Sequence, residues 1–335
     1  MASEWQSMRL GEVLNLKRGY DLPTQSRVVG GVPIVSSSGV TGFHNEAKVD
    51  GPGVVTGRYG TIGQVHYVEG QFWPLNTTLY VQDFKGNNKR FIKYLLETID
   101  YNQYSDKAAV PGINRNHLHE AVVSLPTLAV QGRIAESLSV LEDRIDLLRQ
   151  TNATLEAIAQ ALFKSWFVDF DPVHAKAEGR EPEGMDAATA ALFPSEFQDS
   201  DLGPIPEGWG TESVYGMAQF INGAAYKAFN PNADGRGLPI IKIAEVKSGV
   251  TNKTAFSDEA MPDKYLIGDG DILFSWSGNP DTSIDTFVWA HGRAFLNQHI
   301  FRVIPNQEDQ RSRVLTMLKS LRPVFAEIEG VRIFV

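Results

Sequence analysis

A long heptad pattern occupies the middle of the chain. Apolar residues recur at alternating steps of four and three across residues 131–167, with Asn152 as the one polar member. The series is Ile134, Leu138, Leu141, Ile145, Leu148, Asn152, Leu155, Ala159, Leu162 and Trp166. Pro126 precedes the pattern and Pro172 follows it, which is typical of the two ends of a helix. The spacing predicts one helix over Gln131–Phe167, roughly 55 Å long at ~1.5 Å per residue.

The apolar edge of this helix requires a partner. Seven of its positions are Leu or Ile, and burial at ~1.5 kcal/mol each sums to about 10 kcal/mol that is lost if the edge faces water. We therefore expect a coiled-coil spacer whose subunit interface is the series above apart from Ala159, with Asn152 fixing register or helix number. The alternatives are an ordinary long core helix and a surface role for Asn152.

The regions on either side of the helix repeat the same features in the same order. The matched segments are Trp5 and Trp209, Leu16–Tyr20 and Phe220–Ala224, Val32–Val35 and Leu238–Ile241, Gly53–Arg58 and Gly270–Ser275, and Leu75–Val81 and Leu296–Val303. Short β-branched and aromatic runs alternate with Gly, Pro, Asn and Ser in both regions, and a helical segment follows. The sequence predicts an α+β fold class, with two related domains (a small sheet plus helices each) separated by the spacer helix.

Composition narrows the class of protein. The chain has 335 residues, 42% of them hydrophobic, and no cysteine. Two globular domains are therefore expected, without disulfides, thiolate metal sites or a cysteine nucleophile. The N-terminus lacks the pattern of a signal peptide, and no apolar run approaches the ~18 residues of a membrane span. We expect a cytoplasmic protein with no membrane partner.

The net charge of −9 is unevenly distributed. Residues 1–125, 126–200 and 201–335 carry +1, −7 and −3 respectively. Most of the acidity thus lies in the connector, and the nearly neutral outer regions leave room for basic patches. Charge alone neither favours nor excludes a nucleic-acid partner.

The connector resembles that of a known family. The tract Leu162–Val173, continued by Gly184-Met185, Ala191–Pro194 and Leu202–Trp209, is similar to the specificity subunit of type I restriction-modification systems. The resemblance covers nearly the whole chain. It implies a first target-recognition domain over residues 1–126, a coiled-coil spacer helix over 127–170, a linker over 171–204 and a second target-recognition domain over 205–335.

The resemblance also implies a function. Each domain is expected to read one half of a split double-stranded DNA site, which a stiff spacer longer than one duplex turn (~34–36 Å) suits. The subunit itself is expected to perform no catalysis and to need no cofactor. Its implied partners are modification subunits, which carry the methyltransferase activity, and restriction subunits, which carry the endonuclease and translocase activities.

The end of the chain departs from the family pattern. Members of the family have a second helical segment after the second domain, antiparallel to the first, whereas this sequence ends at Val335. We expect a C-terminally truncated member whose spacer finds its partner in a second copy, forming a homodimer, or in a modification subunit or another chain. The alternative function is an assembly or decoy subunit, which binds modification subunits through its helix without competent DNA recognition.

Candidate DNA contacts in the first domain follow from its basic, aromatic and glycine-flanked segments. They are Lys17, Arg18, Tyr20, Ser37, Ser38, Arg58, Tyr59 and Asn76. Arg58 and Tyr59 are the preferred pair, because the glycines around them let the backbone approach phosphate closely. The remaining positions are equally compatible with solvated side chains or ordinary turns.

Candidate DNA contacts in the second domain come from the corresponding segments. They are Lys242, Trp276, Ser277, Arg293, Asn297, Gln298 and His299. The residue types differ from those of the first domain. Two domains that read different half-sites would differ in this way, and so would two domains that drifted without constraint.

Enzymatic functions lack their motifs in this sequence. No Asn-Pro-Pro-Tyr-like or Asp-Pro-Pro-Tyr-like methyltransferase motif and no Gly-x-x-x-x-Gly-Lys nucleotide-binding loop is present. Asp169, Asp171 and His174 lie close together in the sequence, but Asp171-Pro172 is typical of a helix boundary, so we expect no metal site.

Overall fold

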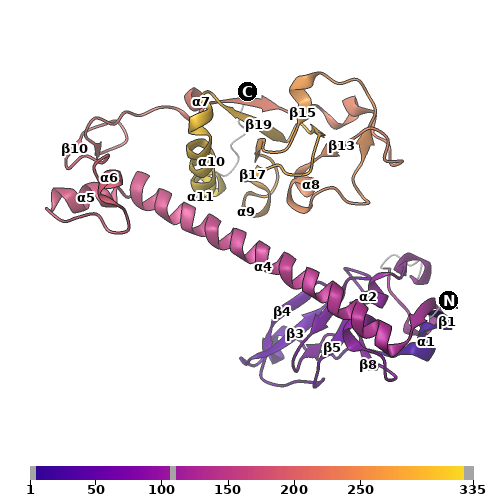
Figure 1. Ribbon diagram of the computed structural model, residues 1–335. Helices are drawn as coiled ribbons and strands as arrows, with labels where there is room; N and C mark the ends of the chain where they lie inside the picture. The colour runs from indigo at the N-terminus through magenta and orange to yellow at the C-terminus, as the bar shows by residue number, and fades with distance from the viewer. Residues whose placement is uncertain (1–4, 106–110, 328–335) are drawn as a thin grey trace. The chain divides into compact units, whose positions relative to one another are not determined.

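The computed structural model of the chain describes residues 5–105 and 111–327 (Figure 1). The chain divides into two compact units, residues 1–150 and residues 151–335. The boundary falls inside helix α4 (Leu128–Phe167), so each unit contains part of that helix.

The first unit contains two sheets and a separate strand pair. The four-stranded sheet has the order β2 (Asn15–Arg18), β8 (Thr78–Asp83), β5 (Gly53–Gly57), β6 (Val65–Val68). The three-stranded sheet has the order β4 (Gly39–His44), β3 (Val32–Ser36), β7 (Trp73–Pro74), and β1 (Trp5–Arg9) pairs with β9 (Val122–Pro126). The helices are α1 (Leu10–Val13), α2 (Lys89–Glu97) and α3 (Arg115–His119), with short 3₁₀ turns at Thr24–Ser26 and Tyr101–Tyr104.

Helix α2 closes the core of the first unit. Asn88 caps its N-terminus by accepting a hydrogen bond from the Phe91 backbone N–H at 3.0 Å. Phe91, Ile92, Leu95 and Leu96 are spaced one turn apart in pairs, so they form one buried stripe that packs against the four-stranded sheet.

The second unit has a corresponding pair of sheets. One has the order β12 (Ala218–Asn222), β19 (Ile300–Pro305), β16 (Ile272–Ser275), β17 (Asp285–Val288). The other has the order β14 (Phe256–Ser257), β13 (Leu238–Ile241), β18 (Ala294–Leu296), β15 (Leu266–Ile267), and β10 (Phe197–Gln198) pairs with β11 (Ile205–Pro206). The helices are α5 (Asp171–Ala177), α6 (Ala187–Ala190), α7 (Val214–Met217), α8 (Ile243–Ser248), α9 (Pro280–Ser283), α10 (Arg311–Ser320) and α11 (Arg322–Glu327), with 3₁₀ turns at Tyr226–Phe229, Asp263–Tyr265 and Glu308–Gln310.

The predicted duplication is confirmed by the strand order. In β2-β8-β5-β6 and in β12-β19-β16-β17, every neighbouring pair is antiparallel. The central strand of the other sheet pairs antiparallel with one neighbour and parallel with the next in both units, β3 with β4 and β7, and β13 with β14 and β18. The two units therefore share an α+β fold.

The structure corrects the register of two matched segments. Tyr20 forms a β-bridge with Leu75, and Ala224 forms the same bridge with Asn297, so Leu75 corresponds to Asn297 and not to Leu296. In the same way Gly57 lies opposite Thr78, and Ser275 lies opposite Ile300. Arg58, the next residue, therefore corresponds to Trp276 and not to Ser275.

The one-residue error has a physical cause. Every residue of β5 and of β16 is buried, so these strands show no alternation of polar and apolar positions. A slip of one residue moves each side chain to the other face of a strand, and only an alternating pattern reveals that slip in the sequence. The match of Trp5 with Trp209 also differs in structure, because Trp5 begins β1 while Trp209 packs among aromatic rings of the connector.

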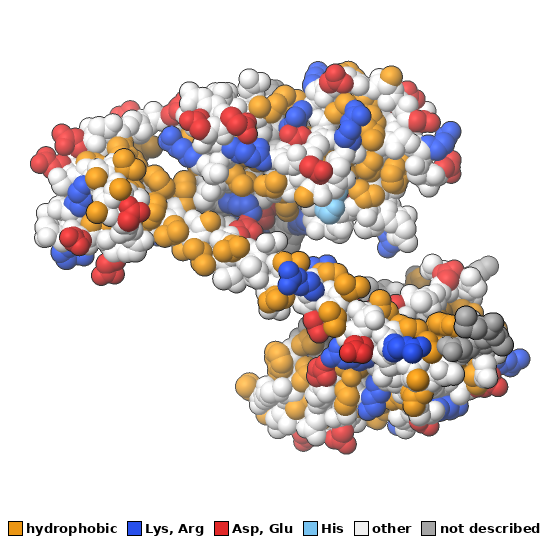
Figure 2. Space-filling view, viewed as in Figure 1, with side chains coloured by type: hydrophobic (Ala, Val, Ile, Leu, Met, Phe, Trp, Pro, Cys, Tyr) orange, Lys and Arg blue, Asp and Glu red, His pale blue; other side chains and the backbone are white. Residues whose placement is uncertain are grey.

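Helix α4 spans 40 residues and begins three residues before the predicted start. Most of the predicted seam is exposed, namely Leu138, Leu141, Ile145, Leu148, Asn152, Leu155 and Leu162. Hydrophobic side chains are visible along the helix (Figure 2). Ile134 packs instead against the core of the first unit, beside the buried Ala135.

An ion pair fastens α4 to the first unit. The Lys93 ammonium of α2 contacts both Glu97, at 3.0 Å, and Glu142 of α4. Burial raises the pKa of the Glu142 carboxyl, but hydrogen bonds from Lys93 and Tyr94 outweigh it, so the net pKa is lowered. Within the second unit, Lys319 of α10 pairs with Glu156 of α4.

The connector after α4 is organised by aromatic side chains. The Trp166 ring lies 5.9 Å from the Phe193 ring, and Trp209 stacks on Phe167 at 5.8 Å. Trp166, predicted at the subunit interface, therefore packs within its own unit. At the other end of the second unit, the helical segment predicted to follow the strands appears as α10 and α11, and residues 328–335 lie outside the described residues.

Candidate nucleic-acid interface

A pocket in the first unit gathers basic side chains from three separate segments. Its volume is about 630 Å³. We call it the Arg58 pocket, and its lining is Lys17, Arg18, Gly19, Tyr20, Asp21, Arg58, Leu79, Asn114, Arg115 and Asn116. The sequence predicted Lys17, Arg18, Tyr20 and Arg58 as two independent clusters, and the structure brings them to one place.

The end of strand β2 supplies one wall of the pocket. The Tyr20 hydroxyl lies 3.0 Å from the Tyr80 hydroxyl, and the Lys17 ammonium lies 5.7 Å from the centre of the Tyr20 ring. The hydrogen bond with Tyr80 lowers the pKa of Tyr20, while burial and the same bond raise the pKa of Tyr80. Gly19 permits this wall, because a Cβ there would lie 2.1 Å from the Leu75 carbonyl oxygen.

Arg58 forms the floor of the pocket. Its backbone N–H donates to the Thr77 carbonyl at 2.9 Å, and its carbonyl accepts from the Ile113 N–H at 3.0 Å. Its Nε–H donates to the Ile113 carbonyl at 3.3 Å, and its guanidinium carbon lies 4.5 Å from the centre of the Tyr59 ring. Both Arg58 and Tyr59 are half-buried.

Sequence reasoning missed the third wall, Asn114–Asn116. Asn114 caps helix α3 by accepting from the Asn116 N–H at 2.9 Å, which places the exposed Arg115 at the pocket rim. The run Asn-Arg-Asn before a helix carries a capping signal and a cation. Its place beside Arg58 depends on the preceding residue, Ile113, whose carbonyl accepts from Arg58, 55 residues away along the chain, and the sequence does not reveal that bond.

The other predicted contacts of the first unit lie outside the lining of the Arg58 pocket. Ser36, Ser37 and Ser38 form a turn, in which the Ser36 hydroxyl lies 3.0 Å from the Ser38 hydroxyl and accepts from the Ser38 N–H at 3.2 Å. Ser37 is buried beneath the loop that holds Gly57 and Gly60. Asn76 donates its side-chain N–H to the Asp21 carboxylate, close to the pocket edge.

In the second unit three of the predicted contacts lie together. The Trp276 ring is 5.9 Å from the His299 ring, and Gln298 lies 3.4 Å from the His299 Nε2. Trp276 also packs on Phe301 of the core, and Ser277 follows it in the same loop.

The remaining predictions in the second unit have different surroundings. The Lys242 ammonium lies over the Tyr226 ring at 5.2 Å. Asn297 is buried, donates its backbone N–H to the Ile241 carbonyl at 3.1 Å and accepts from the His299 N–H at 3.4 Å, which is a structural role. Arg293 is exposed in the turn before β18.

Equivalent positions carry different chemistry in the two units. Arg18 lies opposite Leu79 in the first unit, and Asn222 lies opposite Phe301 in the second, so Asn222 occupies the place of Arg18. Trp276 occupies the place of Arg58. Three buried polar atoms here form no hydrogen bond to the described residues: Asn222 Oδ1, Trp276 Nε1 and His299 Nδ1.

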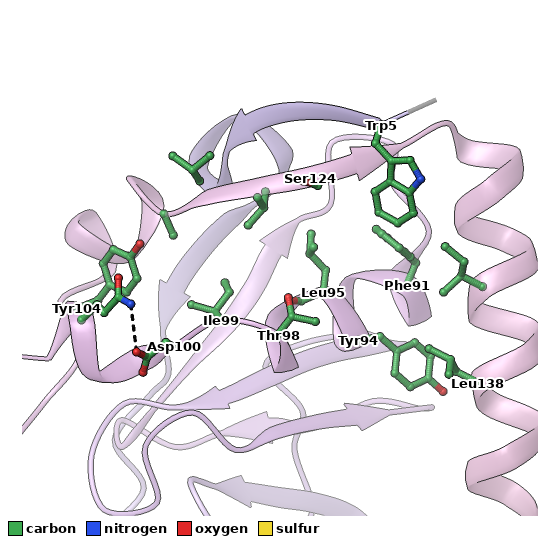
Figure 3. A pocket seen from close by; sticks show the side chains of 15 residues that line it. Trp5, Phe91, Tyr94, Leu95, Thr98, Ile99, Asp100, Tyr104, Ser124 and Leu138 are labelled. Atoms are coloured by element: carbon green, nitrogen blue, oxygen red, sulfur yellow. Dashed lines mark hydrogen bonds between the residues drawn. The ribbon is translucent and has the colours of Figure 1, made fainter. Parts of the chain in front are cut away.

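A second pocket of about 550 Å³ in the first unit is mainly apolar (Figure 3). It lies between α2, β9 and the start of α4, with Trp5, Phe91 and Leu138 at one end and Asp100 and Tyr104 at the other. Gln103 donates to the Asp100 carboxylate at 3.1 Å. Ile134 and Leu138, the first two seam positions, line this pocket, so it continues the apolar edge of α4.

The structure also bears on metal sites and membrane-spanning helices. Across residues 5–105 and 111–327, His, Asp and Glu form no group of three or more that could hold a metal ion. No helix in the same ranges combines the length and the apolar character needed to span a membrane.

Comparison with known proteins identifies similar sequences. Residues 2–157 match the family model described as type I restriction modification DNA specificity domain. The HindI specificity subunit of Haemophilus influenzae is 31% identical over an alignment of 184 residues. The match covers 44% of this chain and 40% of that protein. The EcoprrI specificity subunit of Escherichia coli is 27% identical over 159 residues, 46% of this chain and 38% of that protein.

A solved structure is also similar over most of the chain. The S subunit of a type I restriction-modification system from M. genitalium aligns with a TM-score of 0.49 at 15% identity, covering 96% of this chain and 78% of that one. The sequence matches to the two curated relatives span about two fifths of those proteins' length.

Proposed function

We propose that the chain, whose residues 2–157 match the type I restriction modification DNA specificity domain, is the sequence-reading subunit of a type I restriction-modification complex. The observation that carries this proposal is the Arg58 pocket, which collects Lys17, Arg18, Arg58 and Arg115 beside polar and aromatic side chains. Cations hold phosphates, while Arg and Asn side chains also read base edges.

The duplicated fold supports a split recognition site. In this proposal residues 1–126 read one half-site and residues 205–335 read the other. Residues 127–170 form the spacer and residues 171–204 the linker. A 40-residue helix is ~60 Å long, more than one duplex turn of ~34–36 Å. The chain performs no chemistry itself, and separate modification and restriction subunits supply methylation and cleavage.

A gel-shift and protection experiment tests this proposal. The chain is mixed with its modification subunits and a set of duplexes, and protection from a methyl-sensitive nuclease is read out. We expect one split sequence to be bound and protected above all others. Equal binding of every duplex contradicts the proposal and favours the alternative, an assembly subunit that occupies modification subunits without reading DNA.

The exposed seam of α4 supports a second copy of the chain as one binding partner. The seam is symmetric about residue 150, because Ile134 and Trp166, Leu138 and Leu162, and every other pair of positions lie equally far from it. Two antiparallel copies would therefore match their exposed seam positions from Leu138 to Leu162. The apolar pocket that adjoins Leu138 extends the same surface.

Leu141 and Val140 form a matched pair for testing this homodimer. They are neighbours with 60% and 61% exposure, but only Leu141 lies on the seam. We expect the wild-type chain and Val140→Asp to have the mass of two chains in light scattering at micromolar concentration, and Leu141→Asp that of one. A wild-type monomer with a fully formed helix contradicts the homodimer and leaves the seam to a modification subunit.

A further inference from the structure

Contacts within the first unit restrain both the backbone and the side chain of Arg58. Its backbone is tied to Thr77 and Ile113, its Nε–H donates to the Ile113 carbonyl, and its guanidinium lies over the Tyr59 ring. The side chain is restrained by this hydrogen bond and by the Tyr59 ring, so it has less rotamer freedom to lose when it binds a ligand. The guanidinium is therefore preorganised.

Two glycines, Gly57 and Gly112, allow the close packing around Arg58. A Cβ on Gly112 would lie 2.2 Å from Tyr59 Cε1, so Tyr59 packs directly on the backbone of the segment that bonds Arg58. A Cβ on Gly57 would lie 1.9 Å from the Thr61 carbonyl oxygen, so the loop that carries Arg58 is equally tight. The position of the guanidinium is thus set by backbone contacts from both sides.

The two terminal nitrogens of the Arg58 guanidinium, Nη1 and Nη2, remain available to a ligand. We call this edge of the guanidinium the outer fork. One of five guanidinium N–H groups is used by Ile113, and within residues 5–105 and 111–327 no acceptor bonds Nη1 or Nη2. No carboxylate in the same ranges lies within ion-pair distance of it, whereas Arg18 has Asp21 at 4.0 Å. Arg58 lines the same pocket as the exposed Arg115.

We propose that Arg58 reads a guanine in the half-site bound by the first unit, an inference that rests on the proposed function. The two parallel N–H groups of the outer fork match the O6 and N7 acceptors of guanine in the major groove. A phosphate needs only a positive charge, which the more mobile Lys17, Arg18 and Arg115 supply around the rim. Arg58 is the specificity-determining residue, and these three position the duplex.

Selection from a randomised DNA library tests this assignment. The full chain, in complex with its modification subunits, selects duplexes as wild type, Arg58→Gln, Arg58→Lys and Arg115→Gln. We expect wild type to require guanine at one position of one half-site, with each other base bound about 10- to 100-fold more weakly. Arg58→Gln is expected to lose that preference or move it to adenine, because Gln pairs with adenine N6 and N7. The other half-site stays unchanged.

The two remaining variants separate charge from geometry. Arg58→Lys keeps the charge and can still reach the guanine acceptors, but it lacks the rigid fork, so it is expected to reduce the guanine preference without abolishing it, and it provides a second reading if Arg58→Gln fails to fold. Arg115→Gln is expected to weaken all sequences alike and to reduce the salt slope by about 1.

A guanine preference that is undiminished in Arg58→Lys, or a uniform loss in Arg58→Gln with the preference intact, overturns the assignment and makes Arg58 a phosphate contact. A wild-type chain that selects no sequence contradicts the proposed function instead, so the two failures are distinguishable.

Discussion

The two units carry different side chains at equivalent places of four-stranded sheets that have the same strand order. In the first unit, Arg18 ends β2 and Arg58 follows β5, two strands that flank β8, and Arg115 lines the same pocket. In the second unit the places of the two strand-end arginines are taken by Asn222 and Trp276, with His299 beside them. In the proposed function, the shared fold sets where the reading side chains lie, and the residue types at those places set what they bind.

Both units contain buried polar atoms without a partner in the described residues, Thr77 Oγ1 among them in the first, but the units differ in how the polar side chains at the places of Arg18 and Arg58 are satisfied. The first unit commits the Nε of Arg58 to the Ile113 carbonyl. In the second unit Asn222 Oδ1, Trp276 Nε1 and His299 Nδ1 are buried without a partner in the part of the chain that the structure describes. Buried polar atoms without partners cost free energy, and a ligand that satisfies them regains it. The contrast predicts charge-driven binding in the first unit and binding through neutral groups in the second.

Removing the rim charges has the largest expected effect on this contrast. The triple variant Lys17→Gln, Arg18→Gln, Arg115→Gln is expected to bind DNA about 10- to 100-fold more weakly, because each neutralised phosphate releases a counterion. The slope of log affinity against log salt should fall by about 3.

A matched change in the second unit serves as the control. Asn222→Ala replaces the residue at the place of Arg18 and is expected to leave the salt slope unchanged. The measurement is fluorescence anisotropy between 50 and 200 mM salt, a range chosen around physiological strength. Equal slopes for the triple variant and the wild type would remove the distinction between the units.

A smaller effect, on the free energy of unfolding, is expected from changes at the N-caps of α2 and α10. Asn88 caps α2 through its side chain, whereas Gln310, at the N-cap of α10, forms no side-chain cap. Asn88→Ala is expected to lower the free energy of unfolding by about 1 kcal/mol, and Gln310→Ala to change it by much less. Denaturant titration followed by circular dichroism measures both. Equal losses of unfolding free energy in the two variants would show that the two units do not differ in how these helices are capped.

The sequence predicted those features that depend on periodicity. The steps of four and three located α4 within three residues, and the order of turns and strands revealed the duplication. The earlier start of α4 depends on Gln131, a buried amide that donates to the Asn87 side chain and the Pro126 carbonyl. Such tertiary bonds are invisible in a local pattern.

The candidate site was only half predictable for the same reason. Lys17, Arg18, Tyr20 and Arg58 were recognisable by residue type, and the structure joins them in one pocket. Asn114–Asn116 were missed because they reach the pocket through the bond between Ile113 and Arg58, which bridges a long stretch of chain. The pairing of Arg58 with Trp276 also required strand register, which uniformly buried strands do not encode.

Sequencing of the DNA that the wild-type chain and its modification subunits select from a random library tests the central claim most directly. The account predicts two specified blocks separated by an unspecified gap of constant length, one block for each unit. A single specified block, or no specified block at all, would contradict two related units that each read DNA.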